Sequence, residues 1–323
     1  MKRVLLLATG DTIAHSYAPD RPGVASGAEL LGALPPGAIT ADVVAEDVMA
    51  EPGWDMSPST MLELARRARS ALLERRFDGV VITHGADTLE ETAYLTDLLA
   101  GRAAECGTVV LTCAVRSRDE PSADGPRNLV SSFAAATDEA LRGAGAVVCV
   151  NDEIHAARWV SMTDATSVAG FSSAPFPPLG RVSGGRVETQ APPPPRPPAF
   201  GGDPASDVAL IKTYPGIEPG LLGAAVDAGA QGVVLEGTGT GNVPVGLLSA
   251  IAELTEWGIP VVVASRCRTG RGALGEAGPL QGLAATVGAI GARGLAPQKA
   301  RCALMVALGA GGVDAVREWF DRL

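Results

Sequence analysis

Two short polar segments of the chain carry side chains that could do covalent chemistry. The first, residues 9–12 (Thr-Gly-Asp-Thr), directly follows an apolar run over residues 4–8. That run has no alternation, which is typical of a strand buried on both faces. Ligands of open α/β sheets bind at the carboxyl ends of strands, and Gly10 permits a close backbone approach. A threonine hydroxyl at this place is a candidate nucleophile, although a plain strand-to-loop turn would look the same.

The second segment, residues 83–88 (Thr-His-Gly-Ala-Asp-Thr), follows the apolar residues 80–82. Glu90 and Glu91 come next, in the predicted first turn of a helix, where carboxylates suit the helix dipole. With right-handed crossovers the two segments lie at the same edge of a parallel sheet. Each contains threonine and aspartate, so we expect them to share one site.

Together the two segments resemble the signature loops of the bacterial L-asparaginase family, Thr-Gly-Gly-Thr-Ile-Ala and Thr-His-Gly-Thr-Asp-Thr-Met-Glu-Glu-Thr-Ala-Tyr. The similarity continues through residues 122–129, Asn151 with Asp152, and residues 295–301, and so covers nearly the whole chain. The resemblance implies amide hydrolysis by a threonine nucleophile, through an acyl-enzyme and with release of ammonia. A free hydroxyl needs a neighbouring base, and the oxyanion needs N–H donors.

The resemblance also assigns roles to single residues. Thr12 matches the family's nucleophile, and Asp87 matches the aspartate that binds the substrate's α-amino group within a second Thr-Asp-Lys set. Tyr17 is the tyrosine of the segment that corresponds to the family's flap, which is shorter here.

Three departures from the family pattern change the expected site. Asp11 replaces a glycine and puts a carboxyl beside the nucleophile, where it either orients a base or caps a turn. Ala86 and Met162 fall where the family has threonine and lysine, so the usual proton relay cannot operate. The three lysines of the chain all lie in other segments: Lys2, Lys212 and Lys299.

The loop that holds the substrate has changed as well. Gly53 and Trp54 replace the family's Ser-Gln, which removes polar contacts to the substrate head group. Trp54 either packs against a larger, less polar substrate or packs under the flap. The predicted catalytic residues are Thr12, Asp87, Tyr17 and Asp11, and the predicted substrate-binding residues are Asp87, Gly53, Trp54 and Ala86.

Three functions remain open from these residues, because fold alone does not separate them. The first, which we favour, is an asparaginase-like amidohydrolase with weak asparaginase activity or a related amide as substrate. The second is a non-catalytic homologue, suggested by Ala86 and Met162. The third is an enzyme of the same fold with different amide or lactam chemistry in secondary metabolism.

The elements that must position these residues follow a repeated strand–helix pattern. Predicted strands cover residues 43–47, 108–112 and 146–150, and predicted helices cover residues 58–76 and a segment after Pro126. Residues 15–23 are rich in proline and glycine and read as a loop that could act as a flap. The pattern predicts an α/β fold with a mainly parallel sheet flanked by helices.

A proline-rich stretch separates two predicted domains. We interpret residues 189–206 as a stiff linker. This is a simpler interpretation than a ligand for a proline-binding domain. The larger N-terminal domain is expected over residues 1–188 and a smaller α/β domain over residues 207–323. The smaller domain contains predicted strands and helices at residues 208–211, 220–228, 232–235, 245–257, 260–264 and 298–308.

Composition limits the partners. The net charge of −10 argues against nucleic acid and anionic membranes, and no apolar run approaches the ~18 residues of a membrane span. The chain enters its first strand without a separate signal-peptide region, and its five cysteines read as reduced, mostly core residues. We expect a cytoplasmic protein that acts on a small-molecule amide.

No metal or other cofactor is expected, because the three histidines, His15, His84 and His155, lack ligand spacing. His15 is a weak candidate base, and His84 is expected to order its loop through hydrogen bonds. The glycine-rich turn at residues 237–242 lacks the full dinucleotide fingerprint. By the resemblance it contributes to a neighbouring subunit's site, so we expect a homodimer or homotetramer in which Thr240 or Glu276 reaches a partner.

Overall fold

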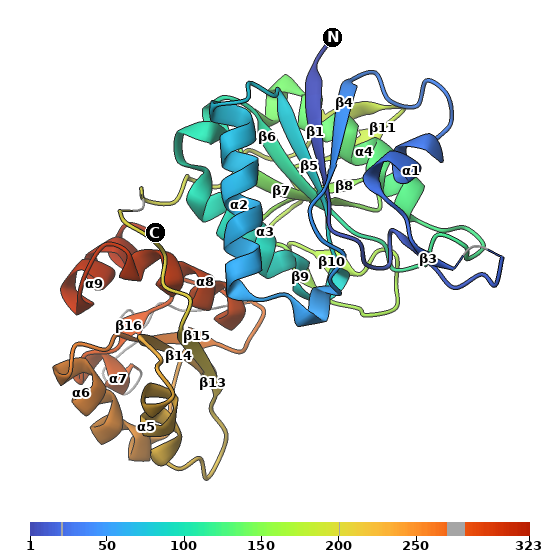
Figure 1. Cartoon of the computed structure of the whole chain (residues 1–323). Helices are drawn as coiled ribbons and strands as arrows, with labels where there is room; N and C mark the ends of the chain where they lie inside the picture. Colours follow the sequence, from blue (N-terminus) through green and yellow to red (C-terminus); the bar gives the residue numbers. More distant parts are fainter. Residues whose placement is uncertain (21, 200, 270–281) are drawn as a thin grey trace. The chain divides into compact units, whose positions relative to one another are not determined.

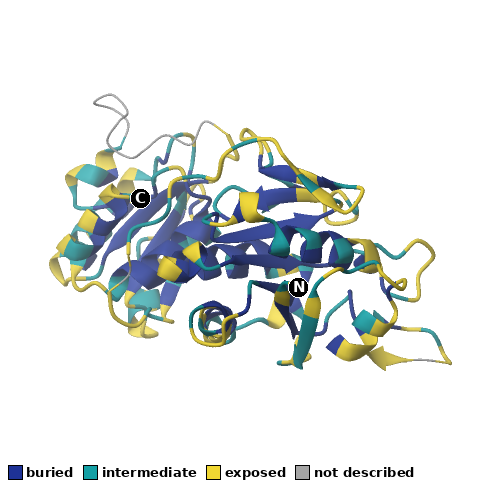
Figure 2. Cartoon of the chain, turned by 90° about the horizontal axis from the view of Figure 1, so that it is seen from above, coloured by how far each residue is buried: buried dark blue, intermediate teal, exposed yellow. Residues whose placement is uncertain are grey.

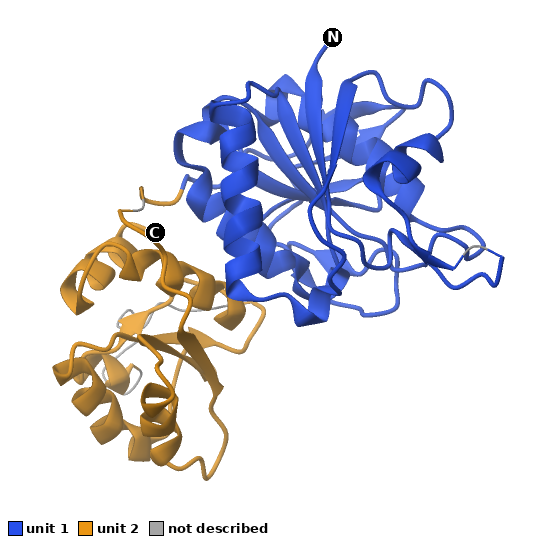
Figure 3. Cartoon of the chain, in the orientation of Figure 1, with its two compact units in different colours: residues 1–196 blue, residues 197–323 orange. Residues whose placement is uncertain are grey.

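The computed structural model describes residues 1–20, 22–199, 201–269 and 282–323. The chain divides into two compact units, residues 1–196 and residues 197–323 (Figure 3). The division falls inside the segment 189–206, whose interpretation as a linker stays a prediction. Glu276, predicted to reach a partner's site, lies outside the described residues.

An eight-stranded sheet forms the centre of the first unit (Figure 1). Five neighbouring strands are parallel, and three antiparallel strands extend the sheet beyond β7. In spatial order the strands are β12 (Arg186–Thr189), β11 (Gly180–Ser183), β8 (Glu153–Ala156), β7 (Ala146–Val150), β6 (Thr108–Thr112), β5 (Gly79–Thr83), β1 (Arg3–Ala8) and β4 (Asp42–Asp47). The predicted mainly parallel α/β sheet is confirmed.

Helices cover both faces of this sheet because every other side chain of a strand points to the opposite face. Leu6 lies in the cluster that contains Leu30 of α1 (Gly27–Gly32) and Phe133 of α4 (Gly125–Thr137). Leu5 lies in the other cluster, with side chains of α2 (Pro58–Leu73) and α3 (Leu89–Ala100). The central strands are therefore buried on both sides, as Figure 2 shows, which explains their unbroken apolar sequences.

The helix predicted over residues 58–76 begins as expected and ends earlier. The Ser57 hydroxyl accepts a hydrogen bond from the Thr60 N–H (3.1 Å), and Pro58 occupies the first turn. α2 ends at Leu73, and Arg76 has a φ of 59°, which a right-handed helix cannot contain.

The prediction that residues 15–23 form only a loop is wrong at its ends. β2 (His15–Ser16) and β3 (Gly23–Val24) pair antiparallel and make the flap a short hairpin. Smaller elements of this unit are β9 (Ser161–Met162), β10 (Phe171–Ser172), and the 3₁₀ turns η1 (Gly53–Asp55), η2 (Ala86–Thr88), η3 (Gly101–Glu105) and η4 (Glu139–Leu141).

The second unit contains a four-stranded parallel sheet with helices packed on it. The strands, in spatial order, are β13 (Val208–Lys212), β14 (Gly232–Gly237), β15 (Val261–Ser265) and β16 (Ile290–Gly291). Its helices are α5 (Gly220–Asp227), η5 (Val245–Leu247), α6 (Leu248–Glu256), α7 (Leu283–Thr286), α8 (Pro297–Leu308) and α9 (Val313–Asp321). The smaller α/β fold predicted for the C-terminal part is therefore present.

Candidate active site

Asp11 and Thr12 lie side by side just after the carboxyl end of β1. The Thr12 hydroxyl donates a hydrogen bond to Asp11 Oδ1 (3.0 Å), and the Thr12 N–H donates to the same oxygen (2.5 Å). Asp11 has a φ of 65°, a left-handed conformation that aspartate tolerates better than most residues. The turn therefore holds a carboxylate against the hydroxyl of the candidate nucleophile.

The other oxygen of Asp11 joins two further loops. Asp11 Oδ2 accepts a hydrogen bond from the Gly53 N–H. A Cβ on Gly85 would lie 2.4 Å from Asp11 Oδ2 and 2.6 Å from the Gly53 Cα. Glycine is required at position 85 because this Cβ has no room. The loops after β1, β4 and β5 thus meet at the Asp11 carboxylate.

Asp87 lies beside this junction, in the turn η2. Its side chain is exposed, whereas Ala86 is partly buried and packs against the apolar cluster of α2 and α3. The following Thr88 donates its hydroxyl to the Gly53 carbonyl (2.6 Å) and ties η2 to η1. The structure therefore places Asp87 at the same sheet edge as Thr12, as the strand pattern predicts.

His84 orders the second loop from inside the protein. Its N–H donates to the Thr112 carbonyl (2.8 Å), and its ring Nδ1 bonds the Gly85 carbonyl (2.8 Å). Burial lowers the pKa of His84, and the nearby negative charge of Asp11 offsets part of this effect. The ring is therefore neutral at pH 7 and donates through Nδ1. The expected ordering of the loop by His84 is present.

Tyr17 lies on the flap hairpin, with 70% of its surface exposed. Its ring packs against the ring of His15, with centroids 4.2 Å apart. The Tyr17 N–H donates to Asp119 Oδ1 (3.1 Å), and the Arg118 N–H donates to the His15 carbonyl (3.0 Å). These bonds attach the flap to the loop before α4. The His15 N–H also donates to the Thr12 carbonyl (3.2 Å), while the ring of His15 contacts the ring of Tyr17.

The positions where the family has a threonine and a lysine are both apolar and packed. Met162 in β9 contacts the same apolar cluster as Ala86. The Met162 N–H donates to Glu90 Oε1 (3.4 Å). Trp54, in contrast, exposes 72% of its surface next to Gly53, so it does not pack under the flap here.

Three carboxylates surround the end of β6. Burial raises the pKa of the Cys113 thiol, and the charges of Asp124, Asp11 and Asp87 raise it further. Asp124 is fixed by the N–H groups of Val115 (3.0 Å) and Arg116 (2.9 Å). The electrostatic environment at this sheet edge is therefore acidic.

All five cysteines are free, and burial also raises the pKa of Cys149 to about 12. Cys267 is exposed, so the prediction of core cysteines does not hold for that residue. Within the described ranges, no group of three or more histidine, cysteine, aspartate or glutamate residues could hold a metal ion. No helix of the described part is long and apolar enough to cross a membrane.

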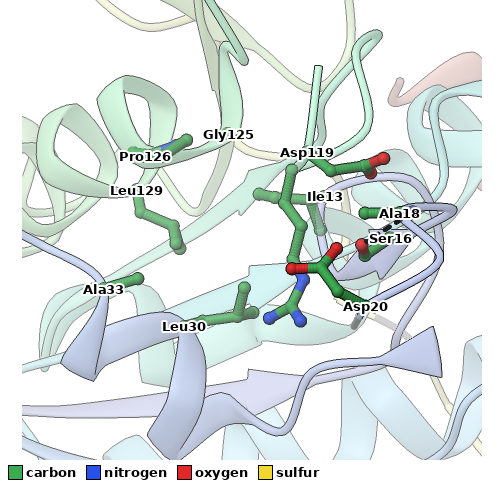
Figure 4. Close-up of a pocket in the computed structure, with 11 residues that line it drawn as sticks. Ile13, Ser16, Ala18, Asp20, Leu30, Ala33, Asp119, Gly125, Pro126 and Leu129 are labelled. Carbon is green, nitrogen blue, oxygen red and sulfur yellow. Dashed lines mark hydrogen bonds between the residues drawn. The ribbon is translucent and has the colours of Figure 1, made fainter. Parts of the chain in front are cut away.

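A cavity of about 400 Å³ lies between the flap, α1 and α4, and Ile13 is one of its lining residues. Figure 4 shows the polar side chains of Ser16, Asp20 and Asp119 on one side of it and the apolar Leu30 and Leu129 on the other. None of the predicted catalytic residues lines it, so we place the chemistry at the Asp11–Thr12 junction.

Sequence reasoning did not single out two threonines that build the site. The Thr88 hydroxyl donates to the Gly53 carbonyl, and Thr83 accepts two hydrogen bonds from Thr9: the Thr9 hydroxyl donates to the Thr83 carbonyl (2.6 Å) and the Thr9 N–H to the Thr83 hydroxyl (3.2 Å). Both threonines are visible in the second polar segment. The sequence does not reveal the hydrogen-bond partner of either threonine, because each bond joins residues at least 35 positions apart.

Comparison with known proteins gives consistent results. The model of the family "Asparaginase, N-terminal" matches residues 3–195, and the model of the "Glutaminase/Asparaginase C-terminal domain" matches residues 207–320. Together they cover nearly the whole sequence.

Individual relatives agree. The chain is 33% identical to L-asparaginase 2 of Escherichia coli, over 95% of this chain and 89% of that protein. It is 31% identical to the glutaminase-asparaginase of Pseudomonas fluorescens, over 95% and 86% of the two chains. Among solved structures, a probable cytoplasmic L-asparaginase from Campylobacter jejuni superposes with a TM-score of 0.85 at 30% identity, covering 100% of both chains.

Proposed function

The chain belongs to the asparaginase family of amidohydrolases, and from this premise we propose that it hydrolyses a small-molecule amide to an acid and ammonia with Thr12 as nucleophile. The observation that carries the proposal is the hydrogen bond from the Thr12 hydroxyl to Asp11 Oδ1 (3.0 Å). A threonine hydroxyl is a weak nucleophile until a base accepts its proton, and here a carboxylate is already in position.

Asp11 takes the role of that base in the proposal. As Thr12 Oγ1 attacks the amide carbon, its proton passes to Asp11 Oδ1. The proton then goes to the leaving nitrogen, the C–N bond breaks, and ammonia departs from an ester on Thr12. Water next attacks the ester with Asp11 again accepting a proton, and Thr12 regains its hydrogen.

Asp11 as base would compensate for the loss of the family's second catalytic set, Thr-Asp-Lys. Ala86 has no hydroxyl and Met162 has no amine, and both pack against apolar side chains. A proton relay through these two positions is chemically excluded. Asp11, in contrast, is held by N–H groups of Thr12 and Gly53 as well as by the Thr12 hydroxyl.

Substrate binding is assigned to the residues around this junction. Asp87 offers an exposed carboxylate to an amino group of the substrate. Gly53 and Ala86 border the same loops, and Trp54 and Tyr17 present exposed aromatic surfaces on neighbouring segments. These features support an asparaginase-like activity that is weak on L-asparagine, or one directed at a related amide.

A second candidate is an enzyme of the same fold with different amide or lactam chemistry. Trp54, 72% exposed where the family has a polar residue, favours it because an aromatic surface can contact a larger substrate. The non-catalytic alternative has less support, since the Asp11–Thr12 pair is intact.

Three further features belong to the proposal. We propose a homodimer or homotetramer in which Thr240 reaches a partner's site, on the resemblance alone. The similarity to a probable cytoplasmic L-asparaginase supports a cytoplasmic location. The domain bounds are proposed at residues 1–188 and 207–323, joined by a linker over residues 189–206.

Ammonia release tests the proposal. We expect purified protein to release ammonia from L-asparagine or from one of a panel of larger amides. Thr12→Ala should lose at least about a thousandfold in kcat, while Thr12→Ser, which keeps a hydroxyl, should retain part of it. Equal turnover by Thr12→Ala would contradict the proposed nucleophile.

A further inference from the structure

The second carboxylate oxygen of Asp11 forms a hydrogen bond outside the Thr12 segment. It accepts a hydrogen bond from a backbone N–H of the loop that is predicted to hold the substrate. Asp11 Oδ2 accepts the hydrogen bond of the Gly53 N–H. A backbone N–H in such a loop is a natural partner for an anionic group of a ligand. Here the protein supplies that anion itself, so a substrate carboxylate would have to displace Asp11 from Gly53.

The Asp11 carboxylate is fixed in this place by its surroundings. A Cβ on Gly53 would lie 2.7 Å from the Gly85 Cα, so the two backbones touch. Asp11 Oδ2 lies over Gly85, and Asp11 Oδ1 is held by two hydrogen bonds from Thr12. Moving the carboxylate away would break all three of its hydrogen bonds at once.

Several carboxylates lie around the junction. Asp87 is exposed in the adjoining turn, and the charges that act on the Cys113 thiol come from Asp124, Asp11 and Asp87. His84 is neutral, because burial lowers its pKa. The position that carries lysine in the family is Met162.

Two arginines that follow β6, Arg116 in the loop and Arg127 in α4, already have partners. Arg116 donates its guanidinium to the Ser122 carbonyl (3.0 Å), and Arg127 pairs with Asp152 (2.8 Å). Among the described residues, neither Asp11 nor Asp87 forms an ion pair. Two such carboxylates repel a third, and the repulsion is strong in a partly buried site.

We infer that this active site selects amides that carry no carboxylate, with Asp87 receiving an amino group of the substrate. The inference rests on the proposed function and narrows its substrate class to neutral or amino-bearing amides. It makes L-asparagine, whose α-carboxylate would meet Asp11, a poor substrate.

Three matched amides test this selectivity. L-asparagine carries the carboxylate, its methyl ester replaces the charge by a neutral group one methyl larger, and 3-aminopropanamide lacks the group altogether. We expect kcat/KM for the ester and for 3-aminopropanamide to exceed that for L-asparagine by about tenfold or more. A value for L-asparagine equal to or above the other two would overturn the inference.

Variants of Asp11 test whether the charge of this residue causes the selectivity. Asp11→Gly suits the backbone, because a φ of 65° is open to glycine, and Asp11→Asn keeps the shape without the charge. If Asp11 is also the base, both variants should hydrolyse all three amides more slowly. This loss cancels when kcat/KM for L-asparagine is divided by kcat/KM for its methyl ester. We expect that ratio to rise about tenfold in both variants, and an unchanged ratio would contradict the inference.

Thr12→Ala separates this inference from the proposed function. Calorimetric titration of this variant with the same three amides measures binding without turnover, and weakest binding of L-asparagine supports the inference even if no hydrolysis is found. If Thr12→Ala is inactive but the wild-type protein prefers L-asparagine, the inference fails and the proposed function stands. If Thr12→Ala turns over normally, the proposed function fails.

Discussion

Asp11 is the residue on which the local structure of the site depends. Its backbone has a φ of 65°, and its side chain accepts hydrogen bonds from Thr12 and Gly53. Glycine at this position would relieve the backbone and lose every one of these bonds. Aspartate at this position therefore has a small conformational cost and provides a fixed carboxylate beside the proposed nucleophile, Thr12.

This balance predicts different stabilities for two substitutions of Asp11. Asp11→Ala keeps the unfavourable φ and removes the acceptors, so it should lower the free energy of unfolding by about 2 kcal/mol. Asp11→Asn tolerates the same backbone and keeps an acceptor oxygen, and should change it by less than about 1 kcal/mol. Urea denaturation followed by circular dichroism measures both. Equal losses in the two variants would contradict the predicted contribution of the Asp11 acceptor oxygens to stability.

Gly85 gives a second prediction at this scale. A methyl group there would collide with Asp11 Oδ2 and the Gly53 Cα. Gly85→Ala should therefore destabilise the protein by about 2 kcal/mol and reduce turnover. Its control is Gly223→Ala in α5, where a Cβ meets no atom within 4 Å and where alanine should stabilise the helix by about 0.5–1 kcal/mol. A Gly85→Ala protein with normal stability would contradict the close packing of these loops.

The sequence predicted which residue types gather at the site but not how they contact one another. Thr12, Asp11 and Asp87 were identified because they follow apolar runs and match a family pattern. The bond from Asp11 to Gly53 was not predictable, since it joins residues 42 apart in the chain. Burial of His84 and exposure of Trp54 likewise depend on tertiary packing, which local patterns do not contain.

At the scale of elements, the parallel strands were the most predictable part. β6 and β7 have the bounds predicted from their apolar runs, because strands buried on both faces have unbroken apolar sequences. β8, β11 and β12 were missed, since their partly exposed and charged residues carry no such run. The flap pair β2–β3 was missed because two-residue strands leave no periodic signal.

Arg196 attaches the segment after β12 to the rest of the first unit. The proline-rich composition of this segment does not predict such an attachment. Its guanidinium donates to the Asp97 carboxylate, to the Asp97 carbonyl (2.7 Å) and to the Ala144 carbonyl (3.0 Å). Burial raises the pKa of Asp97, and the charge of Arg196 offsets part of this effect. The segment is therefore held by an ion pair between a buried Asp97 and a partly buried Arg196.

This ion pair predicts a pH-dependent variant. Arg196→Met leaves Asp97 buried without its cation and should lower the free energy of unfolding at pH 7 by about 3 kcal/mol. A raised pKa means that the folded state takes up a proton more readily than the unfolded chain, so this cost is smallest below the ordinary carboxyl pKa of about 4 and grows as the pH rises through the raised value.

Denaturation of the Arg196→Met variant and the wild-type protein at pH 5 and pH 7 measures this difference. We expect a smaller gap between the two proteins at pH 5. Arg196→Met in an Asp97→Asn background serves as the control, since it lacks the titrating group, and there the cost of the arginine substitution should be the same at both pH values. An equal cost of Arg196→Met at both pH values would contradict the account of Asp97.

For the whole molecule, the proposed assembly is open to a direct test. The second unit exposes Tyr214 (49%), Leu221 (44%) and Val245 (69%), apolar surface that a partner subunit could cover. Light scattering coupled to size exclusion should give a mass of two or four times 32.7 kDa. A single species of monomer mass across the micromolar range would contradict the proposed oligomer and with it the contribution of Thr240 to a partner.

The central claim is that Thr12 forms a covalent ester with the acyl part of its substrate. The most direct measurement is to mix the protein with the best amide of the panel, quench in acid within the first turnovers, and map the added mass by peptide mass spectrometry. We predict an acyl group on the peptide that contains Thr12, absent from the Thr12→Ala protein. An acyl group on another residue, or turnover by Thr12→Ala at the wild-type rate, would contradict the claim.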